Sequence, residues 1–68
     1  MKIGELAKLT NISMRMLRHY DEIGLFKPAH VHSDNAYREY SFRQLPELNR
    51  ILALKDLGFT LEQIAVQL

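Results

Sequence analysis

The sequence predicts a mainly α-helical domain in which a short β-hairpin separates two pairs of helices. Three observations predict this fold class. Apolar residues recur at helical spacing in four segments, and capping residues and stop glycines mark the ends of those segments. A polar turn cluster at 33–36 lies between two stretches of alternating polarity. The 68 residues allow one small domain with a marginal core.

The first 24 residues predict two helices joined by a three-residue turn, which is the helix-turn-helix plan. We expect the first helix to end near Asn11. Ser13 is a good N-cap for a second helix over residues 14–23, and Gly24 is placed to stop it. Apolar spacing assigns the buried faces to Ile3, Leu6 and Ala7 in the first helix and to Leu17 and Tyr20 in the second.

The next segment predicts a β-hairpin. Residues 29–31 and a second stretch ending at Tyr40 alternate in polarity on either side of the turn cluster. In the second stretch, Tyr37 and Glu39 share one face, and Arg38 and Tyr40 share the other. Because an isolated hairpin is marginally stable, we expect it to lean on the helices, with Tyr40 in the core. A helix-turn-helix followed by a hairpin is a winged helix arrangement.

Two further helices complete the predicted winged helix-turn-helix domain. Capping boxes, in which Ser or Thr is followed three residues later by Gln, open them at Ser41 and Thr60. The third helix is expected to reach about Leu57, before Gly58, with a slight kink or an irregular first turn at Pro46. The expected inward residues are Leu45, Leu48, Ile51, Leu52 and Leu54, then Leu61, Ile64, Ala65 and Leu68. The predicted parts are therefore a helix-turn-helix at 1–24, a wing at 27–40 and a helix pair at 41–68.

Composition and motifs exclude several classes of function. The chain has no cysteine, which excludes thiolate metal sites and cysteine nucleophiles within it, and it has no membrane-length apolar run. It also lacks a Gly-rich phosphate loop, a nucleophile elbow and an HExxH motif, so we expect neither an enzyme nor a cofactor. His30 and His32 share one side of a strand, but no third metal ligand is evident, so we expect exposed histidines.

The outward face of the second helix is the candidate DNA-reading surface. The net charge of +1 gives no overall basic signature, so the case depends on where the charges lie. A recognition helix presents its N-terminal residues to base edges, and basic and aromatic residues of a wing suit phosphate contacts. The expected DNA-binding residues are Ser13, Met14, Arg15, Arg18, His19, Tyr20, Lys27, Tyr37, Arg38 and Arg43. A solvated charged surface is the alternative, and the helix-turn-helix spacing favours DNA.

Two acidic residues have no evident reason for their position. Asp21 and Glu22 are adjacent in a helix, so they point about 100° apart and do not form a paired-carboxylate site. They fall near the C-terminal end of the second predicted helix, where the helix dipole disfavours negative charge. Helix stability alone therefore does not explain them.

Several separated blocks of the sequence together resemble one family. They are Ile3–Ala7, Ile12 with Ser13, Arg15, Leu17 with Arg18, Tyr20–Leu25, Tyr37–Ser41 and Leu57–Ile64. In this order they resemble the N-terminal domain of MerR-type transcription regulators over essentially the whole chain. Departures occur at His19, where the family commonly has Tyr, and at Ala36, where Gly is usual in the wing turn. We expect Asn35 to adopt the positive φ in place of that Gly.

The resemblance implies an effector-responsive regulator that binds double-stranded promoter DNA in the cytoplasm as a homodimer. It also implies a dimerisation helix after the fourth helix and a separate effector domain. It further implies that the regulator distorts promoters with an overlong spacer, which realigns the promoter elements for RNA polymerase. Leu68 lies in an apolar helical pattern without a stop signal, so we expect the chain to be part of a longer protein. Two alternatives remain open, an excisionase-like architectural DNA binder and a winged-helix protein-interaction module.

Overall fold

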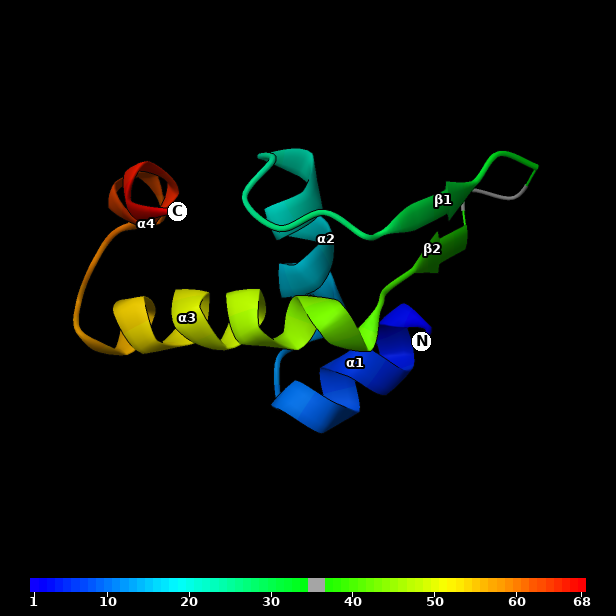
Figure 1. Cartoon of the computed structure of the whole chain (residues 1–68), viewed down its shortest axis with the longest axis horizontal. Coiled ribbons are helices and arrows are strands. Elements are labelled where there is room, and N and C mark those ends of the chain that lie inside the picture. The colour runs from blue at the N-terminus through cyan, green and yellow to red at the C-terminus, as the bar shows by residue number, and fades with distance from the viewer. Residues whose placement is uncertain (35–36) are drawn as a thin grey trace.

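The computed structural model describes residues 1–34 and 37–68, which form four α-helices and one hairpin (Figure 1). The elements are α1 (Ile3–Thr10), α2 (Met14–Glu22), β1 (His30–His32), β2 (Tyr37–Glu39), a 3₁₀ turn η1 (Phe42–Gln44), α3 (Leu45–Asp56) and α4 (Leu61–Gln67). This order confirms the predicted winged helix-turn-helix. The expected positive φ at Asn35 and the departure at Ala36 lie outside the described residues. None of these helices is long and apolar enough to cross a membrane.

The turn between α1 and α2 forms as the sequence predicts. Asn11 ends α1 in the left-handed conformation with φ of 58°, and its N–H donates to the carbonyl of Ala7. Ser13 caps α2, because its Oγ accepts a hydrogen bond from the Met16 N–H at 3.0 Å. Helix α2 ends at Glu22, one residue before the predicted boundary, and Gly24 follows with φ of 75°.

A core of nine large residues holds the elements together. It comprises Leu6, Leu17, Tyr20, Leu25, Phe26, Tyr40, Leu48, Ile51 and Ile64. The chain reverses after α2 because the N–H groups of Leu25 and Phe26 both donate to the carbonyl of Tyr20, at 2.9 and 3.2 Å. This reversal brings Phe26 against Tyr40, with ring centroids 5.8 Å apart and planes 10° from parallel. The prediction that Tyr40 lies in the core is confirmed.

The wing is a short antiparallel hairpin that projects from one end of the molecule (Figure 1). Its register pairs His30 with Glu39 and His32 with Tyr37, and β1 begins one residue later than predicted. The start of the chain runs beside β2, since the Tyr40 N–H donates to the Met1 carbonyl at 2.7 Å. The Met1 amino group lies 2.9 Å from Glu39 Oε2, and this contact lowers the pKa of the Glu39 carboxyl.

Helix α4 begins at its predicted capping box, whereas α3 begins at Leu45, later than the sequence predicts. The Ser41 capping box opens the 3₁₀ turn η1, after which Pro46 occupies the first turn of α3, where its missing N–H costs no helical hydrogen bond. The predicted irregular first turn is thus confirmed. The Thr60 capping box opens α4, and Gly58 takes φ of 95° before it.

The expected burial of Ala65 and Leu68 on α4 is wrong, because Ala65 is exposed and Leu68 is 45% exposed. Figure 1 shows α4 end-on near the C-terminal end of α3, so the two helices cross steeply. A short helix that crosses its neighbour steeply contacts it through about one turn. Ile64 is therefore fully buried and Leu61 is half-buried, while the last turn of α4 extends beyond the core.

The buried hydroxyl of Tyr40 has no hydrogen-bond partner among the described residues. Burial raises the pKa of this hydroxyl, and the nearby charge of Asp21 raises it further, so Tyr40 remains a neutral core residue. We expect Tyr40→Phe to leave the free energy of unfolding unchanged or to raise it by up to about 1 kcal/mol, because it removes an unpaired polar atom. Urea unfolding provides the measurement.

Phe26→Leu is the matched control for this experiment. It keeps an apolar side chain but removes the stack on Tyr40, and we expect it to cost about 1–1.5 kcal/mol. A loss above about 1 kcal/mol in Tyr40→Phe would show that the hydroxyl has a stabilising partner.

Candidate nucleic-acid interface

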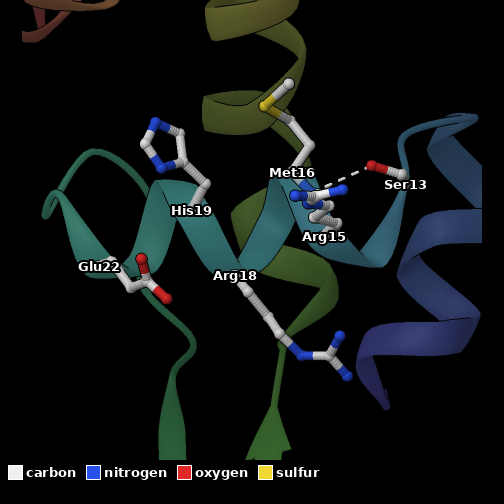
Figure 2. Close-up of a pocket in the computed structure, with 6 residues that line it drawn as sticks. All are labelled: Ser13, Arg15, Met16, Arg18, His19 and Glu22. Carbon is white, nitrogen blue, oxygen red and sulfur yellow. Dashed lines mark hydrogen bonds between the residues drawn. The ribbon is translucent and has the colours of Figure 1, made fainter.

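The exposed side of α2 carries a shallow surface cavity of about 390 Å³ (Figure 2). Its lining residues are Ser13, Arg15, Met16, Arg18, His19 and Glu22. Arg15, Arg18 and His19 are exposed, as the sequence predicts. In Figure 2, Arg18 points to one side of α2 and His19 to the other, so the polar side chains spread across the helix face. Such a spread suits a surface that spans a groove and its phosphates better than it suits a closed pocket.

The N-terminal end of α2 is free to meet an anion. The first turn carries no acidic residue, and the capping contact uses Ser13 Oγ as an acceptor, which leaves the hydroxyl proton available to donate. Met14 is 44% exposed beside this end. Free backbone N–H groups and the positive end of the helix dipole favour phosphate at such a position.

Tyr20 must be removed from the predicted contact residues. It is 1% exposed, and its ring lies in the core with Leu17. The periodicity that placed Tyr20 on the inner face of α2 was sufficient to exclude it from a surface role. Its structural role is to anchor α2 and, through its carbonyl, the reversal of the chain that follows.

Asp21 joins α2 to the wing, which explains the acid near the end of this helix. The Arg38 Nε donates to Asp21 Oδ2 at 2.8 Å, and the Lys27 Nζ lies 3.6 Å from Oδ1. A surface ion pair is typically worth about 0–1 kcal/mol, and the shorter, half-buried contact to Arg38 is the stronger of the two. Sequence reasoning missed this role, although the unexplained acid at Asp21 was the signal that pointed to it.

The predicted wing residues fall into separate places rather than one patch. Arg38 is half-buried against Asp21 instead of pointing freely outward, and Lys27 and Arg43 are exposed. Tyr37 lies on the opposite face of the hairpin, where its ring is 5.2 Å from the ring of His32. The structure thus brings Lys27 and Arg38 together through Asp21 and keeps Tyr37 apart from them.

The two wing histidines lie close together. The rings of His30 and His32 meet edge to face, with centroids 4.6 Å apart, and His32 Nε2 is 3.8 Å from Glu39 Oε1. Within residues 1–34 and 37–68, no group of three or more His, Cys, Asp or Glu side chains is placed to hold a metal ion. These contacts therefore describe a polar face of the hairpin.

The helix pair α1–α2, the wing and the exposed cationic face of α2 together define a winged helix-turn-helix domain. The sequence profile of the MerR HTH family regulatory proteins matches residues 1–68, and the chain belongs to this family.

Curated relatives share sequence over most of this chain. Transcriptional regulator BrlR of Pseudomonas aeruginosa is 55% identical over 62 residues, which cover 91% of this chain and 23% of BrlR. The multidrug-efflux transporter 1 regulator of Bacillus subtilis is 50% identical over 62 residues, which cover 91% of this chain and 22% of that protein. The chain thus spans less than a quarter of the length of either relative.

Solved structures show the same fold. The N-terminal part of MtaN, the Bacillus subtilis multidrug transporter activator, superposes with a TM-score of 0.87 at 35% identity, covering 96% of this chain and 60% of that one. EcmrR in the EcmrR–DNA complex of EcmrR-RPo superposes with a TM-score of 0.86 at 38% identity, covering 88% of this chain and 22% of that one.

The cap of α2 provides a direct test of how this face is positioned. Ser13→Ala removes the acceptor for the Met16 N–H, and we expect it to lower the free energy of unfolding by about 1 kcal/mol. Thr60→Ala removes the equivalent contact at α4, from the Gln63 N–H at 3.1 Å, and is the matched control. Chemical denaturation followed by circular dichroism measures both, and an unchanged midpoint for Ser13→Ala would contradict the capping role.

Proposed function

We propose that this chain is the sequence-specific DNA-binding domain of a bacterial transcription regulator, and that it binds double-stranded promoter DNA through α2 and the wing. The observation that carries the proposal is the division of α2 into two faces. Leu17 and Tyr20 are buried, whereas Arg15, Arg18 and His19 are exposed beside a helix N-terminus without acids. This is the arrangement that a recognition helix in a major groove requires.

The proposed contacts are divided between two parts of the surface. On α2 they are Ser13, Met14, Arg15, Arg18 and His19, and at the wing they are Lys27, Tyr37, Arg38 and Arg43. Arginine side chains on α2 suit guanine edges or phosphates, and those of the wing suit phosphates. In this proposal the domain is a binding module that needs no cofactor and performs no catalysis.

The low net charge is consistent with DNA binding only if acids lie away from the contacting atoms. Glu47 lies on α3 and does not line the exposed face of α2, whereas Asp56, at the end of α3, lines a neighbouring cavity together with Ser13 and Met16. Glu22 lines that face, and Glu62 lines a neighbouring cavity together with His19. The separation of charge is therefore incomplete, and the acids at its edge oppose indiscriminate phosphate binding.

The relatives support the wider role that we propose. BrlR is a transcriptional regulator by name, the second relative is named a regulator of multidrug-efflux transporter 1, and EcmrR was solved with DNA. We propose that this domain likewise acts in the cytoplasm as half of a homodimer, in a longer protein that responds to an effector. Distortion of promoter DNA would then control its use by RNA polymerase.

A protein-interaction module is the second candidate, and one observation favours it. Val66 on α4 is 82% exposed, and Leu57 and Leu68 nearby in sequence are also exposed. Exposed apolar side chains favour a protein contact where they form one contiguous patch. The two functions differ in their response to salt and to changes on α2.

Arg18→Ala is expected to weaken DNA binding at least about fivefold without affecting folding, because its exposed guanidinium would lose a base or phosphate contact. Fluorescence anisotropy in low salt would use a duplex selected with the parent chain from a random library. Arg50→Ala, on α3, is the matched control, since Arg50 contacts the Gln67 carbonyl and does not line the α2 cavity. Equal affinity of Arg18→Ala and the parent would contradict the assignment.

Binding to the same duplex should fall steeply as salt rises. About four phosphate contacts predict a loss on the order of 100-fold between roughly 50 and 200 mM salt, because each contact releases condensed counterions. Anisotropy titrations at four salt concentrations measure the slope. A slope near zero would argue for the protein-interaction module instead.

A further inference from the structure

Asp21 is a single carboxylate that contacts cations from two other segments. Its Oδ2 accepts from Arg38 Nε on β2 at 2.8 Å, and its Oδ1 lies 3.6 Å from Lys27 Nζ in the loop that leaves α2. Each oxygen thus faces a different partner. The carboxylate joins the proposed recognition helix, the following loop and the wing at one point.

Partial burial restricts the geometry of the contact between Asp21 and Arg38. The Asp21 side chain is 16% exposed and that of Arg38 is 28% exposed, whereas Lys27 is 67% exposed. Solvent therefore screens the Lys27 contact more strongly than the contact to Arg38. The pair also lies close to the core, since the charges of Asp21 and Arg38 both act on the buried Tyr40 hydroxyl.

Several described contacts attach the wing to the rest of the domain. The hairpin projects from the body (Figure 1), and its other described attachments include the stack of Phe26 on Tyr40 and the contacts of Met1 with Glu39 and Tyr40. Those attachments hold the base and one edge of the hairpin, and none of them is a polar contact to a side chain of α2. The Asp21–Arg38 contact therefore joins β2 directly to α2 and helps to set the angle between them.

Asp21 also offsets the positive charges of Arg38 and Lys27, which would otherwise attract the phosphates of any DNA. Without the carboxylate, Arg38 and Lys27 would be two unpaired cations beside α2, and unpaired cations bind phosphates without regard to sequence. With the carboxylate in place, the hydrogen bond from Arg38 Nε to Asp21 fixes the orientation of the guanidinium group, including its two terminal nitrogens.

We propose that Asp21 is a positioning residue that sets the DNA selectivity of this domain. It fixes the wing relative to α2, and it lowers the affinity of Arg38 and Lys27 for arbitrary phosphates. The inference rests on the proposed function, because it concerns how the same surface distinguishes one DNA sequence from another.

The test compares Asp21→Ala with Asp56→Ala. Asp56 is the exposed last residue of α3 and lines a cavity with Ser13 and Met16. Its substitution therefore removes the same side chain and charge close to α2 without touching the wing, and it controls for the general electrostatic effect. Dissociation constants are measured for the selected duplex and for a scrambled duplex of equal length. Alanine favours the helix at both positions, and circular dichroism checks folding.

Asp21→Ala is expected to tighten binding to the scrambled duplex about threefold or more, and to lower the ratio of selected to scrambled affinity about tenfold. The salt slope on scrambled DNA should steepen by about one to two, because Arg38 and Lys27 can each form a further phosphate contact. Asp56→Ala should change the ratio less than about twofold. An equal ratio in the two variants, or a lower ratio with weaker scrambled binding, would overturn the proposal.

A double-mutant cycle with Arg38→Gln separates positioning from a general loss of stability. If Asp21 acts through Arg38, then Asp21→Ala should change the ratio of selected to scrambled affinity less than about threefold in a chain that already carries Arg38→Gln. Additive effects would overturn the proposal. A parent chain that does not distinguish the duplexes would refute the proposed function and this inference together, whereas a selective parent with an equally selective Asp21→Ala refutes the inference alone.

Discussion

The burial of Leu17 and Tyr20 is the constraint on which the rest of this domain depends. Both side chains are essentially inaccessible, and together they fix the rotation of α2 about its axis. At about 100° per residue, this rotation turns Arg15, Arg18 and His19 outward. It also places Asp21 near the boundary of the buried face, where a half-buried carboxylate meets the wing. One pair of core contacts thus determines both the candidate DNA surface and its link to β2.

The core and the wing are coupled through the segment that follows α2. The carbonyl of Tyr20 holds Leu25 and Phe26 in a tight reversal, and Phe26 then stacks on Tyr40 at the exit of the hairpin. Two neighbouring residues of α2 therefore attach the wing. The backbone carbonyl of Tyr20 does so through the packing of Phe26 on Tyr40, and the side chain of Asp21 does so through its contact with Arg38. Together with the contacts of Met1 along β2, these attachments hold a hairpin that would be marginal alone.

Much of the fold follows from local signals in the sequence. Ser13, Ser41 and Thr60 each form the cap that their motif predicts, and Gly24 and Gly58 each take a positive φ. These signals are local because a cap involves backbone groups only two or three residues away. The exposure of Arg15, Arg18 and His19 was predictable for a similar reason, because helical spacing fixes one face once the other is buried.

The remaining features depend on contacts between distant residues, which spacing does not encode. Arg38 alternates correctly along its strand, but its pairing with a residue 17 positions earlier depends on the angle between wing and helix. Ala65 continues the apolar pattern of α4, but the crossing of α4 over α3 leaves it exposed. Tyr20 was assigned both an inward face and a DNA contact, and only its inward periodicity agrees with the structure.

The most direct test of the account is to map where DNA contacts the domain. Titration of the isotope-labelled chain with its selected duplex, followed by amide chemical-shift changes, reports every described element in one experiment. The account predicts changes concentrated from Ser13 to His19 on α2 and at Lys27, Arg38 and Arg43 at the wing, with little change on α1. Changes confined to the exposed apolar residues of α4, with α2 unaffected, would contradict it.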